Sequence, residues 1–100
     1  MGKMMKAAQE TQEKMARMQE DLALIEVVGE SGAGLVKATA TAKGELTGLE
    51  IDPSIFNGED KEIVEDLILA AIKEAQTRAS DRSKKELEKI TESLGLPAGM

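Results

Sequence analysis

The sequence predicts an α+β fold in which a long helix, a three-stranded antiparallel sheet and a second long helix follow one another. Apolar residues recur every three or four positions in residues 1–24, which is the period of a helix. They alternate with polar residues in residues 25–52, as in half-buried strands, and the helical period returns in residues 57–94. A chain of 100 residues has room for one core, so we predict a single domain over residues 1–100, with residues 95–100 as a tail.

The first predicted helix carries one apolar stripe. Its members are separated by alternating steps of four and three residues, the heptad spacing of a helix that packs along one seam. The stripe consists of Met4, Ala8, Thr11, Met15, Met18, Leu22 and Ile25. Methionine side chains adapt to irregular surfaces, so we predict loose packing along this seam. We interpret the stripe as hydrophobic core, and a groove for a ligand is the alternative interpretation.

Three short strands joined by tight turns are predicted in the middle of the chain. The first covers residues 25–28, and the glycine-rich residues 29–34 are predicted to form the turn after it. In residues 36–43, Val and Ala alternate with Lys and Thr, which indicates a strand with one buried face. Residues 46–51 form the third strand, with a bulge at its glycine. Such a succession is typical of an antiparallel meander.

The second predicted helix covers residues 57–94. Residues 57–60 offer an N-cap and an acidic first turn. The apolar face that follows is broad, which predicts the best-buried helix of the protein. Two alternatives remain open at Ser80-Asp81, a continuous helix or a break, and the glycine and proline near the end of the chain stop the helix.

The predicted helices are too long for a small globule. Helices of about 23 and 36 residues span roughly 35 and 54 Å. A compact chain of this length has a radius of gyration near 13 Å, so the helices must project from it or pack on another chain. Three strands also leave sheet edges that need covering. We therefore predict a symmetric homodimer.

The composition excludes most catalytic and metal sites. The chain has no histidine and no cysteine, which rules out zinc, haem and iron–sulfur sites and the usual catalytic triads. We predict no catalytic residues, no cofactor, no metal site, no small-molecule substrate and no enzymatic activity. The acidic residues near the start of the second helix have the oxygen ligands that magnesium prefers, but complementing the helix dipole is their simpler explanation. A single phenylalanine cannot build a stacking platform for single-stranded nucleic acid.

No segment predicts targeting or insertion into a membrane. The start of the chain lacks the apolar core of a signal peptide. The longest uncharged apolar run, residues 67–72, is much shorter than a membrane span. We expect a soluble, cytoplasmic protein without a membrane partner, and the lack of cysteine fits a reducing compartment.

Basic side chains form two candidate binding surfaces despite a formal net charge of −6. Four of them lie on one face of the first helix, and four on the second helix fall within roughly 60° of one another. They are Lys3, Lys6, Lys14 and Arg17, and Arg78, Arg82, Lys85 and Lys89. Such stripes can contact DNA phosphates by charge alone, whereas a solvated face is the alternative. Glu10 and Glu13 lie four residues before Lys14 and Arg17, which predicts two ion pairs.

Several short motifs occur together and in order over nearly the whole chain. They are Gly29-Glu30-Ser31-Gly32-Ala33-Gly34-Leu35-Val36-Lys37, Glu50-Ile51-Asp52-Pro53-Ser54, Glu65-Asp66-Leu67 with Ala70-Ala71, the methionine-rich first helix and the closing Leu96-Pro97-Ala98-Gly99-Met100. This set resembles the signature of the YbaB/EbfC family of bacterial nucleoid-associated proteins. One departure is Lys73-Glu74, where similar proteins often have Asn-Asp.

The resemblance implies the same helix–sheet–helix protomer and a tweezer-like homodimer with projecting helices. It implies binding of double-stranded DNA, a change in DNA conformation, and a role in nucleoid organisation and regulation of gene expression. In the family, DNA binding is associated with the first and last helices, so the two basic surfaces are carried over as regions. The acidic net charge predicts modest affinity that depends on local patches. A dimeric protein-binding adaptor that uses its helices as a clamp is the alternative.

Overall fold

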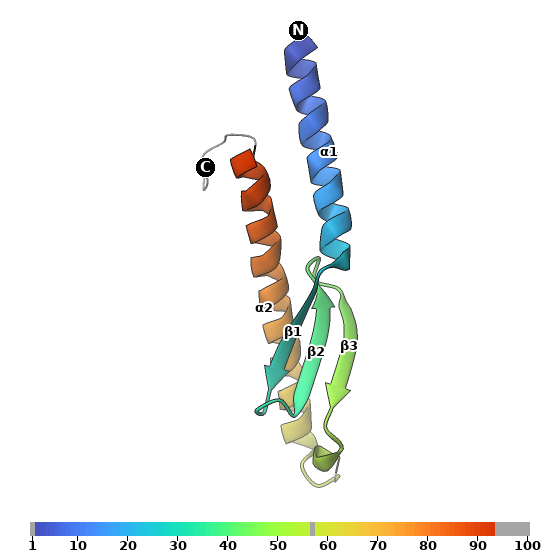
Figure 1. Ribbon diagram of the computed structural model, residues 1–100. Helices are drawn as coiled ribbons and strands as arrows, with labels where there is room; N and C mark the ends of the chain where they lie inside the picture. Colours follow the sequence, from blue (N-terminus) through green and yellow to red (C-terminus); the bar gives the residue numbers. More distant parts are fainter. Residues whose placement is uncertain (1, 57, 94–100) are drawn as a thin grey trace.

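The computed structural model describes residues 2–56 and 58–93 and confirms the α+β architecture (Figure 1). The three strands form one antiparallel sheet in the order β1-β2-β3. In chain order the elements are α1 (Gly2–Leu24), β1 (Glu26–Ser31), β2 (Val36–Thr41), β3 (Leu46–Ile51), the 3₁₀ helix η1 (Pro53–Ile55) and α2 (Lys61–Ser93).

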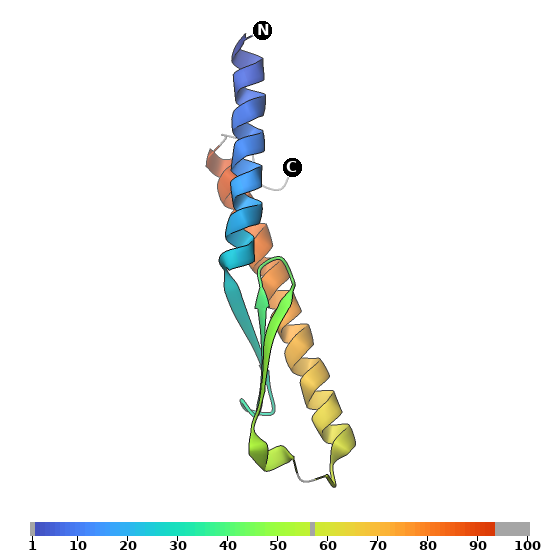
Figure 2. The same cartoon turned by 90° about the vertical axis from the view of Figure 1, so that its right-hand side faces the viewer.

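The chain is elongated, measuring 69 × 22 × 15 Å with a radius of gyration of 18.8 Å. A compact chain of this length has a radius near 13 Å. α2 crosses one face of the sheet and continues past it, and α1 leaves the sheet in the same direction (Figures 1 and 2). Both helices therefore project from the sheet as two arms, as we expected from their predicted lengths. No helix in the described ranges is long and apolar enough to cross a membrane.

Small residues make the contact between α2 and the sheet. Ala71 and Ala75 of α2 and Ala38 of β2 are completely buried. Gly29 of β1 lies directly beneath α2, because a Cβ atom added there would stand 2.3 Å from the Ala71 carbonyl oxygen and 2.3 Å from the Ala75 nitrogen. The helix backbone thus approaches the strand backbone closely, and larger side chains such as Ile68 pack around this contact.

The prediction that a turn starts at residue 29 is wrong. β1 continues beyond residue 28, and Gly29 pairs with Ala38 inside the strand ladder. The turn begins at Gly32, whose φ of 60° is the left-handed conformation that glycine adopts without strain. Gly29 has a different role, since it provides room for α2 rather than a reversal of the chain.

The third strand carries the predicted bulge. Thr39 of β2 faces Gly48, whereas the next residue, Ala40, faces Leu46, so Thr47 is the additional residue of β3. β3 is also an edge strand that α2 does not cover, and Leu46 and Leu49 are about half exposed, at 48% and 50%.

α2 is one helix and does not break at Ser80-Asp81. It begins at Lys61, later than the predicted start at residue 57, because η1 and a connecting loop come first. The Asp60 carbonyl accepts the first helical hydrogen bond, from the Val64 N–H, at 3.0 Å. The candidate cap at Asn57 and the predicted end at Leu94, like the tail, lie outside the described residues.

The base of α1 is fastened to the body of the protein. Met18 and Leu22 are buried in a cluster with Ala42, which follows β2. The Ala42 backbone N–H donates to the carbonyl oxygens of Leu22 and Ile25, at 3.1 and 2.9 Å. These contacts fix where the α1 arm leaves the sheet.

The outer half of α1 is uncovered within one chain. Met4 is 79% exposed and Met15 is 36% exposed, although both belong to the predicted apolar seam. The interpretation of the seam as core is therefore right for Met18 and Leu22 and wrong for Met4 and Met15, whose side chains are exposed in the isolated chain.

Candidate nucleic-acid interface

Arg78 is held between α2 and the edge of the sheet. One guanidinium nitrogen lies 2.7 Å from a carboxylate oxygen of Glu74, and the other donates a 2.7 Å hydrogen bond to the Val28 carbonyl oxygen of β1. This carbonyl belongs to an edge strand, so Arg78 occupies an acceptor that another strand would otherwise use. Arg78 thus links α2 to the sheet through Val28, while its side chain, at 57% exposure, still belongs to the predicted basic stripe.

Glu86 binds two further members of the predicted stripe. Its Oε1 atom lies 3.1 Å from Arg82 Nε and 3.2 Å from Lys89 Nζ. The hydrogen bond from Arg82, and then that from Lys89, lower the pKa of the Glu86 carboxyl. The side chains of Arg82 and Lys89 are 45% and 68% exposed, so Glu86 neutralises two cations that also face solvent.

The remaining basic residues of the prediction differ in their surroundings. Lys85 and Lys6 are exposed and form no ion pair within the described part of the chain. The Lys14 ammonium donates to the Ser93 hydroxyl oxygen at 3.2 Å, which links the two arms. The ion pairs predicted for Lys14 and Arg17 are absent, so this part of α1 is less neutralised than the spacing predicts. The Lys3 side chain lies outside the described residues.

The structure brings part of the two basic surfaces together. Lys14 and Arg17 of α1 and Lys89 of α2 line one cleft of about 180 Å³ between the arms. Met18 and Ile90 also line this cleft, as do the acidic residues Asp21 and Glu86. Four other predicted residues do not line it, namely Lys6, Arg78, Arg82 and Lys85.

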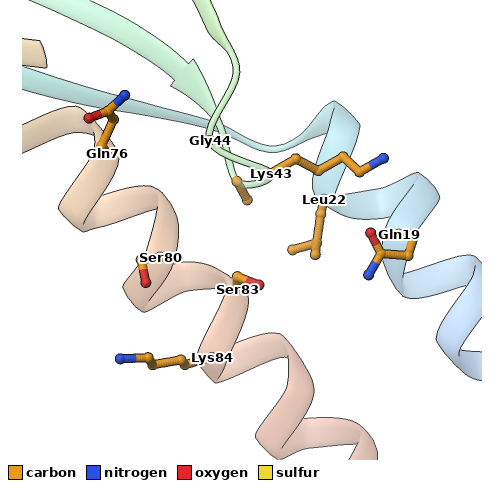
Figure 3. Close-up of a pocket in the computed structure, with 9 residues that line it drawn as sticks. Gln19, Leu22, Lys43, Gly44, Gln76, Ser80, Ser83 and Lys84 are labelled. Atoms are coloured by element: carbon orange, nitrogen blue, oxygen red, sulfur yellow. The ribbon is translucent and has the colours of Figure 1, made fainter.

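A second and larger cleft lies where the arms meet the sheet. It measures about 480 Å³ and is bounded by the base of α1, the turn after β2 and the middle of α2 (Figure 3). Lys43 and Lys84 line it, and neither belongs to the two predicted basic surfaces. No periodic signal could have found them together, because one lies in a turn and the other on a helix 41 positions later.

The charge of the protein is unevenly distributed along its length. Residues 50–66 contain seven acidic residues and one basic residue, which accounts for the entire formal charge of −6. This segment comprises the end of β3, η1 and the start of α2, at the end of the molecule remote from the α1 arm (Figures 1 and 2). The rest of the chain, including both arms, is neutral overall. No group of acidic side chains among the described residues is arranged to hold a metal ion.

Comparison with known proteins matches residues 1–94 to the YbaB/EbfC DNA-binding family. The fold is similar to the crystal structure of an uncharacterized protein, HP0035, from Helicobacter pylori, with a TM-score of 0.77 and 20% sequence identity. The alignment covers 90% of this chain and 95% of that chain. At this identity the structural likeness establishes a common fold. The sequence match extends over both arms and the whole sheet, and the chain therefore belongs to the YbaB/EbfC DNA-binding family.

Proposed function

We propose that this protein binds double-stranded DNA as a homodimer, alters its conformation and thereby contributes to nucleoid organisation and gene regulation. The chain belongs to a DNA-binding family. The observation that carries this proposal is that the net negative charge is confined to one end of the molecule, away from the arms. Because the entire net negative charge belongs to residues 50–66, the arms can approach DNA without a net repulsion of their own. The acidic end is repelled by DNA, which favours an approach with the arms first.

Contacts of this kind position the protein on DNA without reading its sequence. Bidentate contacts of arginine to guanine are among the commonest sequence-specific contacts, and the chain contains three arginines. Two of those arginines, Arg78 and Arg82, already bind carboxylates. Lysine contacts to phosphates therefore supply most of the proposed affinity, and selectivity among DNA sequences should be low.

The exposed apolar surface supports the proposal of a homodimer. Met4 on α1, Leu49 on β3 and Ile63 on α2 are 79%, 50% and 56% exposed in the single chain. A second copy that covers such surfaces would remove apolar area from water, which is the main driving force of association. Sedimentation equilibrium tests this point, with a mass of twice 10.7 kDa expected and a monomer at micromolar concentration contradicting it.

Fluorescence anisotropy with a labelled duplex of mixed sequence tests DNA binding directly. We expect binding at low salt and a linear fall of log K with log salt, with a slope of about −0.9 for each phosphate contacted. Two duplexes of different sequence should give similar affinities. A folded protein that binds neither duplex at low salt would contradict the proposal.

Replacing Glu86 with glutamine should strengthen DNA binding. The change removes the carboxylate that binds Arg82 and Lys89, so both become available to phosphates. We expect higher affinity and a slope steeper by about 0.9 for each new phosphate contact. Glu88→Gln is the matched control, because it changes the charge equally on the same helix and Glu88 forms no ion pair within the described chain. Equal gains in both variants would show that only net charge matters.

A protein-binding clamp is the second candidate function. The exposed methionines Met4 and Met5 on α1 favour it, since thioether side chains adapt to varied apolar partners. A defined protein partner that copurifies in stoichiometric amount, and remains after nuclease treatment, would support this candidate over DNA binding.

A further inference from the structure

The cleft where the two arms meet the sheet has an unusual chemical lining for so acidic a protein. Leu22 and Ala42 contribute its apolar part, and both are buried. The polar part comes from Gln76, Ser80 and Ser83 of α2, with Gln19 on α1. Within the described part of the chain no carboxylate lines it, although the sequence has 19 acidic residues against 13 basic ones. Amides, hydroxyls and ammonium groups are all hydrogen-bond donors, so the lining suits an anion.

The two lysines of this cleft differ from the arginines of the predicted stripe. Lys43 and Lys84 are exposed and form no ion pair within the described residues. They can bind a phosphate without first giving up an internal partner, whereas Arg82 must leave Glu86. Glu45 lies in the same turn as Lys43 but does not line the cleft.

The two side chains stand at opposite edges of the cleft. Figure 3 shows Lys43 on the turn beside α1 and Lys84 on α2, with their ammonium groups directed outward on either side. Their long aliphatic stems are flexible, so each ammonium can follow a phosphate that passes over its edge. Two cations on either side of a donor-lined gap match a phosphodiester backbone, whose charges repeat along a strand, better than a single small anion.

We propose that backbone phosphates of duplex DNA bind across this cleft, with Lys43 and Lys84 as the cationic contacts at its edges. The inference rests on the proposed DNA-binding function. It adds two residues that contact phosphates and the place on the protein where the DNA lies. The position is the fork between the arms, where α1, the turn after β2 and α2 converge. DNA held there would lie against the base of both arms rather than only at their tips.

The test compares the salt dependence of duplex binding in Lys43→Ala, Lys84→Ala and the double variant with that of the unaltered protein. Each lost phosphate contact should reduce the magnitude of the slope by about 0.9, so the double variant should lose about 1.8 for each protomer of the homodimer. Lys61→Ala is the matched control, since it makes the same change in charge at the acidic end of the molecule and should leave the slope unchanged. Lys43→Arg and Lys84→Arg keep the charge and should retain the slope.

The outcomes separate this inference from the function on which it rests. If the unaltered protein binds no duplex at low salt, the proposed function fails and this inference fails with it. If the unaltered protein binds but the folded double variant keeps its slope, the cleft is not a phosphate site and DNA binding stands. A loss in Lys61→Ala as large as that in Lys84→Ala would also overturn the inference, because net charge would then explain both.

Discussion

Replacing Gly29 with alanine is expected to lower the free energy of unfolding by about 3 kcal/mol, the upper part of the usual range for overpacking. The new Cβ would lie 2.3 Å from the Ala71 carbonyl oxygen, 2.3 Å from the Ala75 nitrogen and 2.9 Å from the Ala75 Cα. All three are backbone atoms of α2 and cannot rotate away. The helix must move off the sheet, which loosens the packing around Ala38. Urea denaturation followed by circular dichroism measures the loss.

Gly48→Ala is the matched control for this prediction. Gly48 also lies in a strand, but a Cβ there would meet only side-chain atoms of Thr39, at 3.7 and 3.8 Å. That is ordinary van der Waals contact, so the unfolding free energy should change by less than about 1 kcal/mol. If Gly29→Ala were as mild as Gly48→Ala, the close approach of α2 to β1 would be wrong.

Replacing Ser80 with proline should have an effect of similar size. Ser80 lies in the interior of α2, one residue after the buried Ala79. Proline removes a backbone N–H donor, and its ring clashes with the carbonyl of the residue four positions earlier, at a cost of about 3 kcal/mol or more. We expect that loss in unfolding free energy and a weaker helical signal at 222 nm.

Ser80→Ala is the control for the proline variant. Ser80 is exposed and alanine is the strongest helix former, so stability should be unchanged or slightly higher. A proline variant as stable as the alanine variant would mean that α2 is interrupted at this point. The comparison therefore tests the continuity of the arm, on which the clefts between α1 and α2 depend.

The order and type of the elements follow from local periodicity. The period of 3.6 in α1 and α2 and the alternation in β2 are consequences of which side chains share a face, and each is visible in a short window of sequence. The starts of turns are harder to predict, as Gly29 shows. Glycine is used where φ is positive and also where another backbone comes close. At Gly29 only the position of α2 in the folded protein shows that the second reason applies.

The candidate site was predicted less completely than the fold. Spacing places Arg78, Arg82 and Lys89 on one face of α2, but it does not reveal that Glu74 and Glu86 bind them. Spacing also cannot associate Lys43 with Lys84, because their proximity to one cleft depends on how the turn after β2 meets α2. Charge pairing and cleft formation are contacts between elements, so they have no signature in the period of a single element.

The amino-acid sequence by itself determined that this chain is an α+β protein with two long arms and no residues for zinc, haem, iron–sulfur or triad chemistry, since periodicity and composition can be read without the fold. The tertiary structure decided which cations remain without an ion-pair partner and where the acidic residues gather. It placed the charge of −6 at one end and the arms at the other, because the meander returns the end of β3 and the start of α2 to the side opposite α1. An acidic chain can thus present arms without net charge to DNA.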